Sequence, residues 1–274
     1  MKVASIPEAS SLTSPDEGER WTVTVHDGDA ESDGRRGRAL ALVAAAGGSA
    51  DASSLGLAHE LEVLCRATSR GLGALGAVVS LMTSGNGPDC VVASADARSR
   101  GIGELTFTMG EGPCLDAYAL GRPVLVHDLA STARRQWPGY APSALALGVS
   151  AVFAVPLHVG AAQLGVLETY NDRPTHMEGD ALAMLLTFAG LGTEMLLCGP
   201  ATAPDEGLEV RLNVALDNRA EIHQAQGMVM IDLGIGLAEA LVRMRANAFR
   251  RGVPLIEVAQ EIIAGSVLPG GTET

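Results

Sequence analysis

Basic side chains gather near the carboxyl end of a chain that is acidic overall. The 274 residues carry a formal net charge of −13, yet residues 219–251 hold five arginines against three acidic residues. Arginine binds phosphate through a planar fork and stacks on unpaired bases. The overall acidity argues against a general polyanion binder, so a nucleic-acid contact would be local. The candidate contacts are Arg219, Arg243, Arg245, Arg250 and Arg251, together with Gln226, whose amide can hydrogen-bond a base.

Cysteine is the second residue type that could do chemistry. Cys65, Cys90, Cys114 and Cys198 are widely spread and form no C-x-x-C pair, so neither a zinc module nor a disulfide scaffold is expected. The glycine-rich residues 110–114 predict a turn that leads into a helix N-terminus, where a thiol pKa is lowered. Cys114 is therefore either a redox-sensing thiol or a packed core residue. Cys65 and Cys198 lie on apolar helix faces and are expected in the core.

Histidines at predicted strand ends, His127 and His158, show no metal-ligand spacing. The sequence also lacks the nucleophile elbow, the phosphate-binding loop and the H-E-x-x-H motif. We therefore predict no metal site and no catalytic residues, that is, a protein that is not an enzyme.

The arginines belong to a segment whose apolar period is purely helical. Residues 208, 212, 215, 222, 229 and 233 follow 4–3 spacing, which is typical of a coiled-coil seam and predicts a long first helix. Gly234 and Gly236 end that helix, and Gly252 and Pro254 separate a second helix from a third. Arg243 and Arg250 are seven residues apart and share one helix face.

The middle of the chain alternates β-type runs with turn residues, which predicts an α+β sandwich. Strands are expected at 77–82, 91–94, 104–107, 123–126, 151–157 and 163–170, which together make an antiparallel sheet of about six strands. Helices are expected at 55–72, 113–120, 143–147 and 178–197.

The composition of the ends differs from that of the middle. Residues 1–50 are rich in Ser, Gly, Asp and Glu and predict a disordered tail, in which residues 21–25 could still dock as an edge strand. No secretory signal and no membrane-spanning run is recognised, so we expect a cytoplasmic protein that has reduced thiols and no membrane contact.

The C-terminal segment resembles the ANTAR domain, an RNA-binding output module of bacterial antiterminators. Residues 218–230, 237–245, 248–251 and 254–259 carry this resemblance. It implies that an all-α three-helix bundle at residues 207–266 binds RNA. Where the family often has Lys before the Gly, this chain has Gln226, which adds no charge.

The middle segment resembles a GAF domain through residues 110–117, 121–126, 137–141, 148–157 and 164–170. The resemblance implies a sensory domain at 51–199 and a small-molecule ligand of unknown identity between the sheet and its covering helices. The residues that would line this ligand site are Cys114, Asp116, His127 and Tyr170. A linker at 200–206 joins the two domains, and a tail follows at 267–274.

The order of the two modules resembles that of actinobacterial GAF–ANTAR regulators. This resemblance implies a homodimer that binds tandem RNA stem-loops in mRNA leaders and does not bind duplex DNA. Two alternatives remain. One is a GAF-based signalling or dimerisation protein that acts through protein partners. The other is a cysteine-dependent free-methionine-sulfoxide reductase, in which Cys90 would be the resolving thiol.

Overall fold

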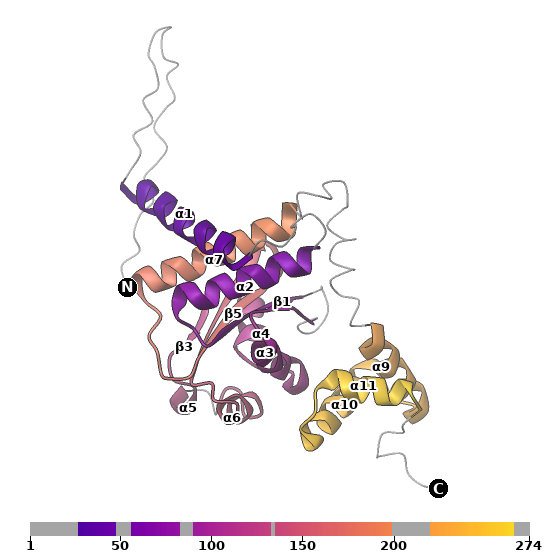
Figure 1. Ribbon diagram of the computed structural model, residues 1–274. Helices are drawn as coiled ribbons and strands as arrows, with labels where there is room; N and C mark the ends of the chain where they lie inside the picture. The colour runs from indigo at the N-terminus through magenta and orange to yellow at the C-terminus, as the bar shows by residue number, and fades with distance from the viewer. Residues whose placement is uncertain (1–26, 48–55, 83–89, 133–134, 199–219, 266–274) are drawn as a thin grey trace, which may run out of the picture.

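The computed structural model describes residues 27–47, 56–82, 90–132, 135–198 and 220–265. The predictions for residues 21–25, the linker, the C-terminal tail, Arg219 and the first part of the long helix lie outside these ranges. The described chain forms two units: an N-terminal unit (residues 27–198) built around a sheet, and a C-terminal unit (residues 220–265) made of helices (Figure 1).

An antiparallel sheet in the order β2-β1-β5-β4-β3 lies at the centre of the N-terminal unit. Its described strands are β1 (Gly76–Leu81), β2 (Cys90–Ser94), β3 (Val124–Val126), β4 (Ala151–Val159) and β5 (Ala162–Asn171). Val, Ala and Leu fill successive positions of β1 and β4, and every residue of β1 is buried. Both faces of the sheet are therefore covered, as continuous apolar strands require.

The expected strand at 104–107 is wrong, because these residues lie in helix α3 (Ala97–Met109), and the described sheet has five strands. Asp96 caps this helix by accepting a hydrogen bond of 2.7 Å from the backbone N–H of Ser99. Gly110, in the left-handed conformation, ends it. The local cap and the burial of Ile102 and Thr106 on one face outweigh the β-propensity of Thr106 and Phe107.

Helices α2 (Leu57–Leu72) and α7 (Gly179–Cys198) cover one face of the sheet, and α1 (Asp27–Gly47) packs against these two helices. The prediction of a disordered tail is wrong for residues 27–47, which form α1. The second half of this segment is rich in Ala, Leu and Val, and Ala39 is fully buried while Leu42 and Val43 pack against the core. The average composition of residues 1–50 did not indicate this helix, because the polar first half of α1 offsets its apolar second half.

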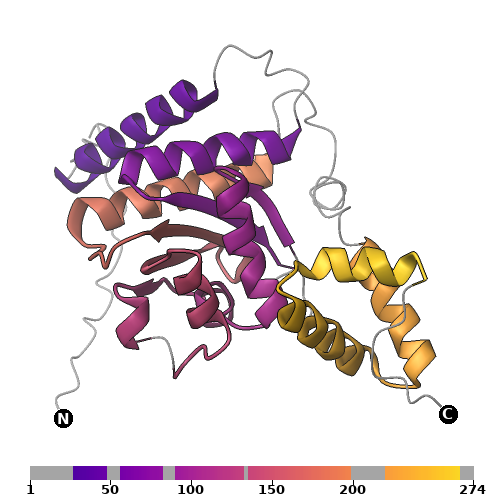
Figure 2. The same ribbon diagram turned by 60° about the horizontal axis from the view of Figure 1, so that its bottom comes forward.

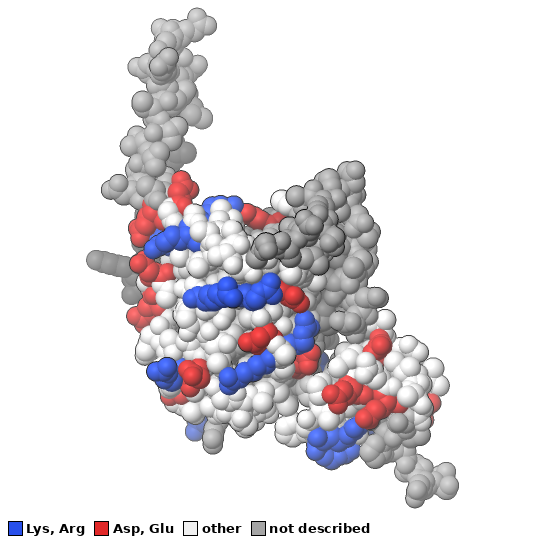
Figure 3. Space-filling view, in the orientation of Figure 1, with Lys and Arg blue, Asp and Glu red and all other residues white. Residues whose placement is uncertain are grey.

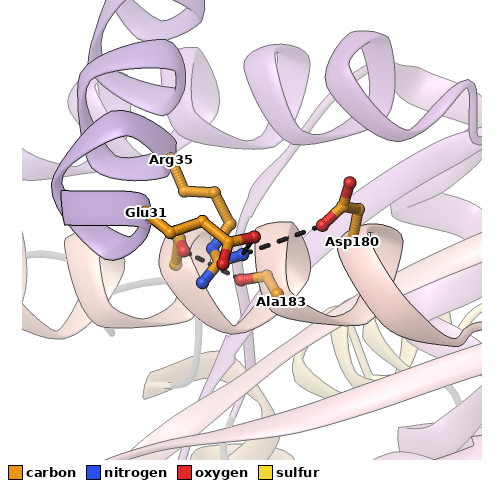
Figure 4. A network of polar contacts seen from close by, with 5 residues as sticks. Glu31, Arg35, Asp180 and Ala183 are labelled. Atoms are coloured by element: carbon orange, nitrogen blue, oxygen red, sulfur yellow. Dashed lines mark hydrogen bonds and ion pairs between the residues drawn. The ribbon is translucent and has the colours of Figure 1, made fainter. Parts of the chain in front are cut away.

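Ion pairs also join α1 to α7 (Figure 4). The Arg35 guanidinium lies 3.0 Å from Glu31 on its own helix and 3.7 Å from Asp180 at the start of α7. Arg36 pairs with both oxygens of Glu194 at 2.7 and 2.8 Å. Because such exposed pairs contribute at most about 1 kcal/mol each, the apolar contacts hold α1 in place.

The opposite face of the sheet is covered by α3, α4 (Pro113–Leu120), α5 (Leu129–Thr132) and α6 (Tyr140–Ala146). Trp137, Tyr140 and Tyr170 are among the large side chains of this second core. On the first face, α7 is long and apolar enough to cross a membrane, and it packs against α2 and β4 as a core helix.

The C-terminal unit consists of α9 (Ala220–Leu233), α10 (Leu237–Arg251) and α11 (Leu255–Ile263), which confirms the three-helix prediction. Gly234 and Gly252 adopt left-handed conformations where the chain turns between helices. Ala225, Met244, Ala248 and Val258 are among the residues of a small separate core. Helices α10 and α11 contact α3 of the N-terminal unit, so the two units touch (Figure 2).

Candidate functional site

Helix α10 positions four of the predicted arginine contacts. Ala240, Met244 and Ala248 turn one face of the helix into the small core. The remaining faces carry Arg243, Arg245, Arg250 and Arg251. Because these arginines do not share one direction, their environments differ.

Glutamates partner two of these arginines. Arg243 donates two hydrogen bonds to Glu239 one turn earlier, the shorter at 2.7 Å. Arg251 donates to both oxygens of Glu261 on α11. Arg250, which is exposed, has no ion-pair partner among the described residues. Arg250 is therefore the arginine of α10 that is most open to an external anion.

Arg245 lies against the N-terminal unit. Its Nε donates a 2.8 Å hydrogen bond to the carbonyl oxygen of Phe107, in the last turn of α3. A Cβ atom added at Gly110 would come within 2.8 Å of its Nη1 atom, so the guanidinium is seated directly on the end of α3. Burial lowers the pKa of Arg245. Its side chain is thus partly withheld from solvent by the other unit.

Phe249 lies one turn after Arg245, at the same boundary. It lines two clefts, of about 350 and 410 Å³, that open on either side of it between α10 and the N-terminal unit. Met109 lines both clefts as well. Phe249 is nevertheless 55% exposed, so the two units contact each other without closing over the ring.

Gln226 faces the interior of the bundle rather than solvent. The residue is only 9% exposed, and its Nε2 donates a 2.8 Å hydrogen bond to the carbonyl oxygen of Leu237. The amide therefore ties α9 to the start of α10, and it is not available to a base in this structure. Arg219 lies outside the described residues.

The charge of the C-terminal unit is nearly balanced. Residues 220–265 hold four arginines and five acidic residues. Figure 3 shows red and blue atoms side by side on the visible face of this unit. The basic excess of residues 219–251 is thus offset by Glu257 and Glu261 of α11, and an RNA contact would depend on individual arginines rather than on a broad field.

A buried polar cluster in the N-terminal unit is the second candidate site. Glu168 on β5 is 1% exposed and accepts a 3.0 Å hydrogen bond from the hydroxyl of Tyr170. Cys114, on the first turn of α4, lies against Glu168 and Ser80. Burial raises the pKa of Glu168 to about 7, and the hydrogen bond from Tyr170 offsets part of that rise. The carboxyl group thus gains or loses its proton near neutral pH.

Several atoms of this cluster lack a hydrogen-bond partner among the described residues: Glu168 Oε1, the Tyr140 hydroxyl and Thr106 Oγ1. Glu111 fixes the start of α6, where Tyr140 lies, because its Oε1 accepts hydrogen bonds from the backbone N–H groups of Gly139 and Tyr140. Unpaired polar atoms in a core are costly, and they are typical of functional sites.

The structure brings together two of the four predicted ligand residues, Cys114 and Tyr170, which meet at Glu168. Asp116 instead accepts a 2.7 Å hydrogen bond from Gln136 outside the cluster. The Nδ1 atom of His127 lies 3.1 Å from the carbonyl oxygen of Thr175, and its ring stacks on that of His176. Asp116 and His127 therefore lie outside the cluster around Glu168.

Burial, not the helix N-terminus, controls the Cys114 thiol. Burial and the neighbouring Glu168 raise its pKa well above the usual value, which opposes the thiolate that a redox sensor needs. Cys65 is buried as expected, whereas Cys198, which we expected in the core, is exposed at the end of α7.

Sequence reasoning missed Glu168 and Tyr140 as site residues. The signal was nevertheless present, because Glu168 is the single charged residue of β5. A charged residue in a strand that is buried on both faces is rare unless it has a partner or a function.

Family comparisons match both units. A model of the GAF domain matches residues 54–196, and a model of the ANTAR domain matches residues 211–263. No curated protein matches the chain.

Two solved structures resemble part of this chain at TM-scores below 0.5. The GAF domain of an Acinetobacter phosphoenolpyruvate-protein phosphotransferase is 14% identical, with a TM-score of 0.44, and the match covers 60% of this chain and 91% of that one. Free methionine-R-sulfoxide reductase from Neisseria meningitidis is 16% identical, with a TM-score of 0.43, and the match covers 64% and 93% of the two chains. Likenesses at this level say nothing of activity.

Proposed function

Because the chain belongs to the GAF domain family and carries an ANTAR domain behind its GAF domain, we propose that it is a transcription antitermination regulator. In this proposal the GAF domain senses a signal, and the ANTAR domain binds tandem RNA stem-loops in mRNA leaders as a homodimer. GAF and ANTAR domains are regulatory, and ANTAR domains bind RNA.

The observation that carries the proposal is the ANTAR match over a helix that presents Arg245, Arg250 and Arg251 in its last two turns. Arg250 lacks an ion-pair partner among the described residues and is the first choice for a phosphate contact. To contact RNA, Arg243 would have to break its ion pair with Glu239, and Arg251 its ion pair with Glu261. Gln226 and the seam residues before Ala220 have no part in the contact that we propose.

The buried cluster around Glu168 is the proposed place of signal reception. A ligand with a hydrogen-bond donor could satisfy Glu168 Oε1, which has no partner among the described residues. A ligand that prefers one arrangement of the two domains would change the affinity for RNA. By linkage, RNA would change the affinity for that ligand by the same factor. The reductase alternative is disfavoured, because the Cys114 thiol is buried and its pKa is raised.

Binding of the purified full chain to three nucleic acids tests the proposal: a tandem stem-loop RNA, a single stem-loop and duplex DNA. We expect preference for the tandem RNA, with two protein chains per RNA. The Arg250→Ala variant should weaken binding and lower the slope of log K against log salt by about one. The matched variant Arg173→Ala, at an exposed arginine of the GAF domain, should bind as the wild type does. No binding to any RNA would contradict the proposal and favour an output through protein partners.

A further inference from the structure

One face of α10 carries an arginine and an aromatic ring side by side. Arg245 and Phe249 are one helical turn apart, so their side chains are neighbours on the helix surface. Val242 and Ala246 share this face, and all four residues line the same cleft against the GAF domain. We call Val242, Arg245, Ala246 and Phe249 the stacking face. It carries no acidic residue.

This chemistry fits unpaired bases better than it fits a protein core. Bases splayed out of RNA loops stack on aromatic rings and on guanidinium planes, and arginine also neutralises the phosphate beside them. A large aromatic ring that stays more than half exposed at a domain boundary has much of its surface left without a partner. The stacking face is thus only partly used by the contact seen in the structure.

The GAF domain holds this face by a small set of groups. The backbone carbonyl of Phe107 accepts the Arg245 hydrogen bond, and Met109 lines the clefts on both sides of Phe249. A phosphate that pairs with Arg245 would have to displace the carbonyl oxygen of Phe107 and would need the space that the end of α3 now occupies. Docking on the GAF domain and binding of RNA by this face therefore exclude each other.

We propose that the stacking face binds unpaired RNA bases, with Phe249 as a stacking residue, and that the GAF domain and RNA compete for it. This inference rests on the proposed function, because it names how the ANTAR domain contacts RNA and how the GAF domain restrains it. When only the undocked form binds, the apparent affinity for RNA is the intrinsic affinity multiplied by the fraction of chains that are undocked.

The first test replaces the ring. Phe249→Leu keeps an apolar side chain at the clefts and removes the aromatic surface, so we expect the full chain to lose about tenfold in affinity for the tandem stem-loop RNA. The control is Ile231→Ala, which truncates an exposed apolar side chain of α9 outside the stacking face. Ile231→Ala should bind as the wild type does. Unchanged binding by Phe249→Leu would overturn the stacking role.

The second test opens the docked contact from the GAF side. Met109→Arg places a cation beside Arg245, and Val159→Arg adds the same charge at the tip of the β4–β5 hairpin, which lines neither cleft. We expect Met109→Arg to raise RNA affinity at least fivefold over Val159→Arg, because α10 is released. Leu147→Arg, at an exposed position that lines the first cleft, should act in the same direction.

The outcomes separate the inference from the function beneath it. RNA binding that is the same in Met109→Arg, Leu147→Arg and Val159→Arg would overturn the competition and leave the antitermination proposal intact. Absence of RNA binding in the wild type and in every folded variant would overturn both. Thermal melts of each variant confirm that the domains remain folded.

Discussion

At the scale of single residues, burial determines which side chains can change charge. The GAF domain places Glu168 beside Tyr170 and Cys114 with almost no access to solvent. Desolvation penalises the carboxylate, so its pKa rises, and the same effect keeps the neighbouring thiol protonated. Both effects can be measured in the full chain without knowledge of a ligand.

Replacing Glu168 should change how stability depends on pH. Its pKa rises from 4.5 to about 7 on folding, so between these values the folded chain binds more protons than the unfolded chain. The free energy of unfolding therefore falls as pH rises through this window, by about 3 kcal/mol from this group. Glu168→Gln should remove this pH dependence of the free energy of unfolding, measured by denaturant titrations at about pH 5 to 8. Glu178→Gln, at an exposed glutamate, should keep it. Equal slopes in Glu168→Gln and the wild type would contradict a buried, titrating carboxyl group.

Alkylation of the native chain should distinguish its thiols. Cys198 is exposed and should react with iodoacetamide at once, whereas Cys65 and Cys114 should react only after denaturant is added. Burial raises the pKa of Cys65 to about 12, and that of Cys114 also rises. Peptide mass spectrometry reads the sites. Rapid native modification of Cys114 would restore the redox-sensor alternative.

At the scale of elements, close backbone packing decides which glycines can be replaced. Gly165 of β5 pairs with Leu81 of β1, and a Cβ atom there would lie 2.2 Å from the carbonyl oxygen of Ser80. Backbone cannot move aside as a flexible side chain can. Gly190, in the middle of α7, has open space around its Cβ position.

Two alanine variants test this contrast. Gly165→Ala should lower the free energy of unfolding by about 1–3 kcal/mol or more, because β1 and β5 must separate locally. Gly190→Ala should leave stability unchanged or raise it by up to about 1 kcal/mol, through helix propensity. Thermal melts measure both. A stable Gly165→Ala protein would mean that the β1–β5 pairing is not as close as the structure has it.

The elements that could be predicted are those with strong local periodicity. The apolar strands at 151–157 and 163–170 and the amphipathic helix at 55–72 match β4, β5 and α2. The strand predicted at residues 104–107 was wrong, because the cap at Asp96 starts a helix that continues through these β-forming residues. Helix α1 was not predicted, because its stability comes from tertiary packing against α2 and α7, which the composition of the segment does not show. The arginines of α10 were predicted from the local charge. Their partners on α11 and α3 could not be predicted, because these are tertiary contacts between elements.

At the scale of the whole molecule, the ANTAR domain rests on the GAF domain through a small contact. Helices α10 and α11 meet only one helix of the GAF domain extensively among the described residues, and the hydrogen bond from Arg245 to Phe107 is central to it. In the proposed regulator, a modest preference of ligand or RNA for the docked or the undocked state would shift the population of the two states.

In the proposed function, the ANTAR domain contacts RNA through α10. Ultraviolet crosslinking of the full chain to the tandem stem-loop RNA, followed by peptide mass spectrometry, tests it most directly. We expect crosslinked nucleotides on peptides that contain Phe249 and its arginine neighbours, Arg245 and Arg250. Crosslinks confined to the GAF domain, or to α9 and α11, would contradict it.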